Sequence, residues 1–319
     1  NPTILSQEKY RLHLAETEDF SNEVICDLKK RFNYSEGAVL QEELRQLLED
    51  VDIFWFRLGY KIDKSVLSSK SKVRILATPV TGIDHIDEDL CEELGVEIIC
   101  LRGEYEFLKE VRATAEHTLN LAMTLMRNIV PAVLDVKGGN WNRDLFRGRE
   151  LYKKKVGIIG YGRLGEICAE LFSAFGCEIM IYDTQRKASK YMEAQSIKEI
   201  ILWSDIVSLH VSYNKSNHNL IDSTTISYFD SQTYLINTSR GGLIDEDALY
   251  EQLLNKKIAG AALDVLEGEP EVKSNKLINY ANNHSNLIIT PHIGGNTYES
   301  FEKTEKFISQ KINTAIEKL

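Results

Sequence analysis

Three side chains in the C-terminal half of the chain have types that could do chemistry together: Arg240, Glu269 and His292. An arginine fork binds a carboxylate through two hydrogen bonds and polarises the adjacent carbonyl. A histidine can protonate a new hydroxyl oxygen, because its ordinary pKa of about 6.5 lies near neutrality. A neighbouring carboxylate would favour the imidazolium form and fix its tautomer. The trio suits the reduction of a 2-keto acid by a hydride donor.

The placement of these residues after expected strands should bring them to one site. Each follows a short apolar run that we expect to form a parallel strand; the runs are 233–237, 259–265 and 286–290. In an open α/β sheet, ligands bind beyond the carboxyl ends of the strands. Taken singly, Arg240 also fits a surface cap, Glu269 a solvated turn, and His292 a residue that only orders its loop. Their occurrence together favours a catalytic site.

A glycine-rich turn earlier in the chain predicts where the hydride donor binds. Gly160, Gly162 and Gly165 have the G-x-G-x-x-G spacing, after an apolar run and before a run with helical periodicity. The first glycine permits a tight turn, the second lets the backbone approach a pyrophosphate, and the third lets helix and strand pack closely. An ordinary strand–turn–helix is the alternative, but this context favours a dinucleotide site.

Asp183, at the end of the next expected strand, favours NAD over NADP. It stands 18 residues beyond Gly165, close to the position where an acid binds the ribose 2′-hydroxyl. A carboxylate there would repel a 2′-phosphate. Arg186 lies close enough to weaken the preference, and we expect NAD as the cofactor.

The elements that must position these residues alternate between strands and helices along the whole chain, which predicts an α/β fold with parallel sheets. We expect two doubly wound parallel-sheet domains, with a Rossmann NAD domain (113–296) inserted into a flavodoxin-like substrate domain (1–112 and 297–319). The helices Ala113–Ile129 and Glu299–Leu319 would connect them. Pro131 is expected to break the first of these helices.

Composition excludes several classes of partner. The chain has 319 residues and a formal net charge of −10, which argues against nucleic acid and against an anionic membrane. No apolar run approaches the length of a membrane span. The chain has five cysteines, an odd number, and none of them are paired at C-x-x-C spacing. We therefore expect reduced thiols in a cytoplasmic protein. The histidines show no metal-ligand spacing, and no metal is expected.

The ordered set of motifs resembles the D-isomer-specific 2-hydroxyacid dehydrogenases, most strongly from Gly138 to Asn296. The resemblance implies that Arg240 binds substrate, Glu269 orients and charges the histidine, and His292 is the acid/base. It also implies a set of cofactor-binding residues in the glycine loop and near the nicotinamide. These are Gly160, Gly162, Arg163, Leu164, Gly165, Asp183, His210, Val211, Thr238, Asp264 and Gly294.

The resemblance is weaker in the N-terminal part but extends to the substrate. Val80, Thr81 and Gly82 lie in a segment similar to the family loop whose N–H groups hold the substrate carboxylate. Arg57–Lys61 resembles the segment that approaches the substrate phosphate in 3-phosphoglycerate dehydrogenases, and a solvated edge is the alternative. Gly138–Trp141 resembles the loop and arm through which these proteins dimerise, which implies a homodimer.

These observations predict an NAD-dependent dehydrogenase that interconverts a D-2-hydroxy acid and its 2-keto acid. The substrate is a small acid, phosphorylated or not, with 3-phosphoglycerate as one example. The alternative is an NAD(H)-sensing, corepressor-like binding protein on the same fold, because a fold alone does not decide function.

Overall fold

The computed structural model describes residues 9–186 and 190–318, which form two compact units. The described residues of Asn1–Leu108 and Thr297–Leu319 make up one unit, and those of Lys109–Asn296 make up the other. The second unit begins at Lys109 rather than at residue 113, because the intervening segment is bound to it. Arg163 Nη1 donates to the carbonyl oxygen of Val111 at 2.9 Å, and Arg112 forms an ion pair with Glu170.

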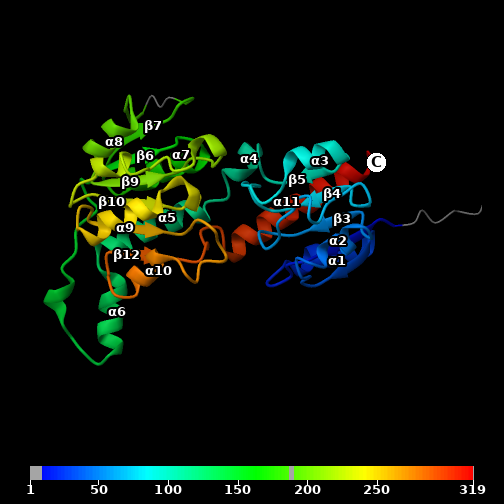
Figure 1. Ribbon diagram of the computed structural model, residues 1–319, viewed down its shortest axis with the longest axis horizontal. Coiled ribbons are helices and arrows are strands. Elements are labelled where there is room, and N and C mark those ends of the chain that lie inside the picture. The colour runs from blue at the N-terminus through cyan, green and yellow to red at the C-terminus, as the bar shows by residue number, and fades with distance from the viewer. Residues whose placement is uncertain (1–8, 187–189, 319) are drawn as a thin grey trace, which may run out of the picture. The chain divides into compact units, whose positions relative to one another are not determined.

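The first unit is built on a five-stranded parallel sheet in the order β2-β1-β3-β4-β5 (Figure 1). Its strands are β1 (Arg11–Leu14), β2 (Asn33–Glu36), β3 (Ile53–Trp55), β4 (Ile75–Ala77) and β5 (Glu97–Ile99). Its helices are α1 (Asn22–Arg31), α2 (Leu44–Leu48), α3 (Glu88–Leu94), α4 (Tyr105–Leu108) and α11 (Tyr298–Ile316). This strand order is the flavodoxin-like one that was predicted.

Helix α11 returns the end of the chain to the first unit. Thr297 caps its start by accepting a hydrogen bond from the Ser300 N–H. Ile308, Ile312 and Ala315 then recur on one face at helical spacing and are buried.

The second unit holds a seven-stranded parallel sheet in the order β12-β11-β10-β9-β6-β7-β8. Its strands are β6 (Lys155–Ile159), β7 (Glu178–Tyr182), β8 (Met192–Glu193), β9 (Ile206–Leu209), β10 (Tyr234–Asn237), β11 (Gly260–Leu263) and β12 (Leu287–Ile289). Its helices are α5 (Ala113–Met126), α6 (Ile129–Lys137), α7 (Arg163–Ala174), α8 (Ile197–Trp203), α9 (Glu246–Leu254) and α10 (Lys276–Ala281), with short 3₁₀ turns η1 (Arg143–Phe146), η2 (Lys215–Asn217), η3 (Thr225–Tyr228) and η4 (Gly241–Leu243). The predicted Rossmann fold is confirmed, with the strand order reversing between β6 and β9.

The central strands of this sheet are covered on both faces. Every residue of β9 and of β11 is buried, which explains why apolar and polar residues do not alternate along these strands, where Ser208 is the one polar side chain. Asp245 caps the start of α9, since its side chain accepts a hydrogen bond from the Ala248 N–H.

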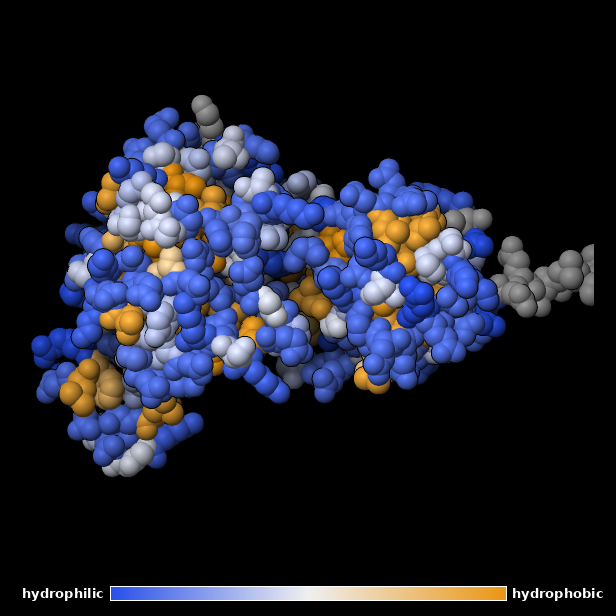
Figure 2. Space-filling view, in the orientation of Figure 1, coloured by the Kyte–Doolittle hydropathy of each residue, from blue (hydrophilic) through white to orange (hydrophobic). Residues whose placement is uncertain are grey.

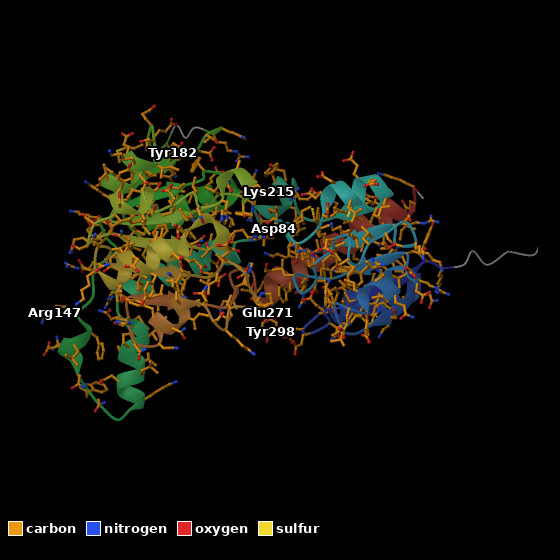
Figure 3. The ribbon with its side chains drawn as sticks, in the orientation of Figure 1. Asp84, Arg147, Tyr182, Lys215, Glu271 and Tyr298 are labelled. Atoms are coloured by element: carbon orange, nitrogen blue, oxygen red, sulfur yellow. The ribbon has the colours of Figure 1, made fainter. Side chains whose placement is uncertain are left out.

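The prediction that Pro131 ends a helix was wrong. Helix α5 ends at Met126, and Asn128 turns the chain in a left-handed conformation with φ 52°. Pro131 lies in the first turn of the next helix, α6, where a missing N–H removes no helical hydrogen bond. Helix α6 and η1 form an arm that projects from the second unit, and Arg147 lies on it (Figures 1 and 3).

Among the described residues, no single helix is both long and apolar enough to cross a membrane. Tyr105–Met126 and Ile129–Lys137 meet the length and composition required only as a pair, which is bent by 64°.

Candidate active site

The glycine loop joins β6 to α7, and each of its glycines has a distinct surrounding. Gly160 has φ 91°, and a Cβ there would lie 2.5 Å from the carbonyl oxygen of His210. A Cβ on Gly165 would lie 2.0 Å from the carbonyl oxygen of Gly160. A Cβ on Gly162, in contrast, would meet no atom within 4 Å. Only Gly162 therefore borders open space, as a loop that admits a pyrophosphate requires.

The N-terminus of the following helix, α7, borders this open space. Gly162 is the N-cap of α7 and supplies no side chain to bond the first N–H groups. Such groups, with the helix dipole, favour an anion. Arg163 and Leu164 begin the helix, and burial lowers the pKa of the Arg163 guanidinium. The loop and helix thus fit the diphosphate of a dinucleotide.

Asp183 follows Tyr182, the last residue of β7 (Figure 3). Its carboxylate accepts hydrogen bonds from the N–H groups of Tyr161 at 2.7 Å, Gln185 at 2.7 Å and Arg186 at 2.9 Å. Burial acts to raise the pKa of Asp183, but these three bonds outweigh burial and lower it. A negative charge is therefore held where a ribose 2′-hydroxyl is expected.

The loops that follow β10 and β11 touch each other. A Cβ on Gly241, directly after Arg240, would lie 2.0 Å from the backbone carbon of Leu266. Only a glycine permits this approach. The contact places Arg240 on a loop packed against the one that carries Glu269.

The loop after β12 is held by Asp264, which is 1% exposed. Its carboxylate accepts hydrogen bonds from the N–H groups of Ile293 at 2.9 Å and Gly294 at 2.7 Å, and from the Thr290 hydroxyl at 2.6 Å. Burial favours a raised pKa for Asp264, but hydrogen bonds from His117, Thr290 and these N–H groups lower it. An ionised, buried carboxylate thus organises the segment that contains His292.

His292 and Glu269 form a pair. His292 Nδ1 lies 2.5 Å from Glu269 Oε1, and the two side chains are 28% and 31% exposed. The backbone of His292 has φ 53°, an uncommon conformation for a residue other than glycine. Its N–H donates to the carbonyl oxygen of Asp264 at 2.8 Å, which helps to hold that conformation. The predicted histidine–carboxylate pair is present, with Nε2 as the remaining ring nitrogen.

Sequence reasoning missed His117, which lies on α5. Its Nε2 lies 3.3 Å from Asp264 Oδ1 and 3.1 Å from the Thr290 hydroxyl. The next residue, Thr118, bonds Thr238 through their hydroxyls at 2.7 Å. The sequence predicted an amphipathic helix here, and the polar positions of that helix were the available signal for a face directed at the strand ends.

The side chains of two further predicted residues, His210 and Arg240, bond partners within the second unit. The ring nitrogens of His210 are occupied by Ser208 Oγ at 2.8 Å and by Cys168 Sγ at 4.0 Å, so its side chain faces the core. Its backbone, with that of Val211, borders Gly160. Arg240 Nη1 donates to the carbonyl oxygen of Ser239 at 2.9 Å.

In the first unit, Val80, Thr81 and Gly82 follow β4 at the carboxyl edge of the sheet. None of the hydrogen bonds found among the described residues uses the backbone N–H of these three. Lys61 is exposed and lies 3.3 Å from Asp63. Arg57, which follows β3, is 16% exposed and pairs with Glu305 at 2.9 Å.

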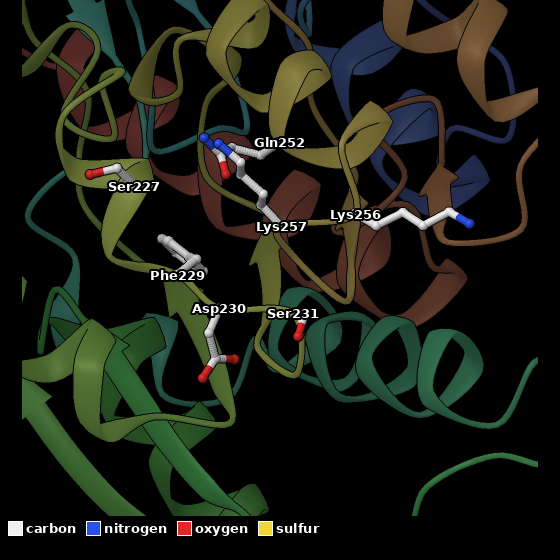
Figure 4. Close-up of a pocket in the computed structure, with 7 residues that line it drawn as sticks. All are labelled: Ser227, Phe229, Asp230, Ser231, Gln252, Lys256 and Lys257. Atoms are coloured by element: carbon white, nitrogen blue, oxygen red, sulfur yellow. The ribbon is translucent and has the colours of Figure 1, made fainter.

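A shallow pocket of about 340 Å³ lies elsewhere in the second unit (Figure 4). It is lined by Ser227, Phe229, Asp230, Ser231, Gln252, Lys256 and Lys257. These residues precede β10, lie near the end of α9 or follow that helix, so the pocket lies at the amino ends of the strands. It is separate from the loops that carry the histidine and arginine.

Comparison with known proteins agrees with this architecture. The model of the NAD-binding domain of D-isomer specific 2-hydroxyacid dehydrogenases matches residues 119–294. The chain is 28% identical over 307 residues to the hydroxypyruvate reductase of Thermotoga maritima, covering 95% of this chain and 97% of that protein. It is 34% identical over 269 residues to the D-3-phosphoglycerate dehydrogenase of Bacillus subtilis, covering 83% of this chain and 49% of that protein.

The chain therefore spans about half the length of that Bacillus subtilis enzyme. Among solved structures, the D-lactate dehydrogenase of Aquifex aeolicus, complexed with NAD and lactic acid, has a TM-score of 0.83 with this chain. Its sequence identity is 26%, over 96% of this chain and 95% of that one.

Proposed function

Because this chain belongs to the family of D-isomer specific 2-hydroxyacid dehydrogenases, whose cofactor is NAD, we propose that it interconverts a small D-2-hydroxy acid and its 2-keto acid. The observation that carries the proposal is the 2.5 Å contact between His292 Nδ1 and Glu269 Oε1. The pair lies in the same unit as a glycine loop with open space at Gly162. A proton donor and a dinucleotide site are the two parts that a keto acid reduction needs.

The glycine loop, the start of α7 and Asp183 would hold the cofactor. NADH, when bound, supplies the hydride that reduces the keto carbon. The N–H groups of α7 would face its diphosphate, and the Asp183 carboxylate its adenosine ribose. Asp264 and Thr238 would border the nicotinamide, as would the backbone of His210 and Val211.

His292 acts as the general acid in this scheme. Because Nδ1 is bonded to Glu269, Nε2 is the nitrogen that carries the proton to the keto oxygen. In the reverse direction, the neutral ring takes the hydroxyl proton back at the same nitrogen. Glu269 fixes the ring orientation and stabilises the positive charge.

Arg240 binds the substrate carboxylate and polarises the neighbouring carbonyl. The N–H groups of Val80, Thr81 and Gly82 are proposed to bind that carboxylate as well. These roles follow the family motifs and the positions of the residues at the carboxyl ends of β10 and β4.

Oxidation of NADH with a panel of 2-keto acids tests the proposal. The panel contains pyruvate, glyoxylate, hydroxypyruvate and phosphohydroxypyruvate, with Arg240→Ala and Arg240→Lys as comparisons. We expect turnover of at least one compound and a raised KM with slower turnover in Arg240→Ala. Arg240→Lys should recover only part of the activity lost in Arg240→Ala, since an ammonium keeps the positive charge but cannot form the paired hydrogen bonds of a guanidinium. NADH binding without turnover of any 2-keto acid would favour the NAD(H)-sensing alternative.

The arm is proposed to pair two copies of this chain. Its exposed apolar residues are Ile129, Val130, Val133, Leu134, Val136, Trp141 and Leu145. Figure 2 shows apolar residues on this projecting part, at the lower left. Such a patch is typical of a protein interface. The homodimer and the cytoplasmic location stay predictions.

A further inference from the structure

The segment that follows β3 is surrounded by carboxylates of its own unit. Glu16 Oε2 accepts hydrogen bonds from the Arg57 N–H at 2.5 Å and from the Gly59 N–H at 3.4 Å. A Cβ on Gly59 would lie 3.0 Å from Glu16 Oε1, so the glycine leaves room for this carboxylate. An acid side chain therefore already occupies the backbone donors of the turn.

The Arg57 side chain is bound in the same way. Its Nη2 donates to Glu305 Oε1 at 2.9 Å, and its Nη1 to the carbonyl oxygen of Glu18 at 3.1 Å. The guanidinium lies over the Phe301 ring, 4.1 Å from its centre. Glu305 is 1% exposed at its side chain and also accepts the Ser21 N–H at 2.9 Å.

The charges of this cluster decide what it can bind. Arg57 contributes one positive charge, and Glu16 and Glu305 contribute two negative charges at hydrogen-bond distance. The cluster lies after β3, at the carboxyl edge of the sheet where ligands of this fold bind. A phosphate there would meet a neutralised arginine and occupied N–H groups instead of free donors. The other basic residues of this edge are also beside acids, since Arg102 pairs with Glu88 and Lys61 with Asp63.

We propose that Glu16 and Glu305 exclude phosphorylated substrates, so that the substrate is a 2-keto acid without a phosphate group. The inference rests on the proposed function and specifies its substrate class. Specificity of this kind comes from a repulsive element directed at the wrong substrate. Arg57 then serves to bind α11 to the turn after β3, through Glu305.

The test compares hydroxypyruvate with phosphohydroxypyruvate, which differ only by the phosphate group. For the wild-type protein, we expect kcat/KM to be at least about 100-fold higher for hydroxypyruvate, the size expected when like charges are brought together. Phosphohydroxypyruvate used as well as hydroxypyruvate, or better, would overturn the inference and leave the proposed function intact. Absence of turnover with every 2-keto acid would overturn both.

The variant Glu305→Gln tests whether Glu305 causes the discrimination against the phosphorylated substrate. The amide keeps an acceptor for the Ser21 N–H but removes the charge that neutralises Arg57. We expect the preference for hydroxypyruvate to fall about tenfold or more, through a lower KM for phosphohydroxypyruvate. Glu18→Gln is the matched control, because it removes an equal charge nearby while only its backbone contacts Arg57. An equal effect of both variants would overturn the role of Glu305, and the wild-type ratio decides the substrate class if Glu305→Gln does not fold.

Discussion

At the scale of single residues, the site is a set of side chains held by partners far away in the sequence. His292 is bonded to Glu269 through its ring and to Asp264 through its backbone. The residue types and their order along the chain were enough to predict the His292–Glu269 pair. The partnership of Asp264 with His117 was not predicted, because helix α5 and strand β11 are remote in sequence.

We predict that His292→Ala slows turnover by about 10²–10⁴-fold, the usual contribution of a general acid. The Kd for NADH should stay within a few-fold, because the glycine loop and Asp183 are not altered. Stopped-flow NADH oxidation and fluorescence titration measure the two quantities. His284→Ala, which removes a histidine after α10, is the control, and wild-type turnover in His292→Ala would remove His292 from the mechanism.

The burial of His210 predicts how the free energy of unfolding depends on pH. Burial lowers the pKa of His210 from 6.5 to about 4. Between pH 6.5 and pH 4, His210 binds a proton in the unfolded chain but not in the folded one. The contribution of His210 to the free energy of unfolding is therefore complete above pH 6.5 and is lost as the pH falls towards 4. The free energy of unfolding that is lost through His210 over this pH range amounts to about 3 kcal/mol.

Urea unfolding followed by circular dichroism at pH 7, 6, 5 and 4 measures this loss. Acidic groups with lowered pKa values, such as Asp264, add to it in the same direction, so the useful quantity is the difference from His210→Gln. That variant should lose less stability between pH 6.5 and 4 than the wild type. Parallel curves for the two proteins would contradict the assignment.

At the scale of elements, the strand–loop–helix unit β6–α7 carries the cofactor prediction. The sequence identified the three glycines and their context, since each element there is local. It did not show that α5 presents His117 and Thr118 to the ends of β10 and β11. The helical period was visible in the sequence, but the identity of the facing strands was not.

Two substitutions in the glycine loop should separate binding from folding. Gly162→Ala adds a Cβ to open space, so we expect an unchanged melting temperature and NADH affinity at least about tenfold weaker. Gly165→Ala places a Cβ 2.0 Å from a backbone oxygen and should destabilise the unit. Overpacking of this kind costs about 1–3 kcal/mol.

Thermal unfolding with and without NADH checks both expectations. An NADH affinity in Gly162→Ala equal to that of the wild type would argue that the diphosphate lies elsewhere.

At the scale of the whole molecule, the chain folds as two parallel-sheet units, as was expected. The arm is the feature that neither unit explains by its own packing. Trp141 is 84% exposed and Leu145 74% exposed, although both are large and apolar. A second copy is the partner that we propose for it.

We predict that Leu134→Glu on the arm converts a dimer into a monomer, because a charge in an apolar interface is costly to bury. Light scattering coupled to size-exclusion chromatography over a range of concentrations gives the mass directly. Leu202→Glu, on an exposed position of α8, is the control and should leave the mass unchanged. A wild-type protein that is monomeric throughout would remove the proposed interface.

The features that depend on neighbours along the chain could be predicted from the amino-acid sequence. The glycine spacing, the buried strands and the arginine, glutamate and histidine after them all follow from local pattern. The partners of other buried charges, in contrast, became apparent only in the folded chain. The sequence left open whether Arg57 approaches a substrate phosphate or lies on a solvated edge, and in the structure its guanidinium is paired with Glu305, 248 residues away. The reason is physical: a turn or a strand is specified by adjacent residues, whereas the partner of a buried charge depends on how separate elements pack.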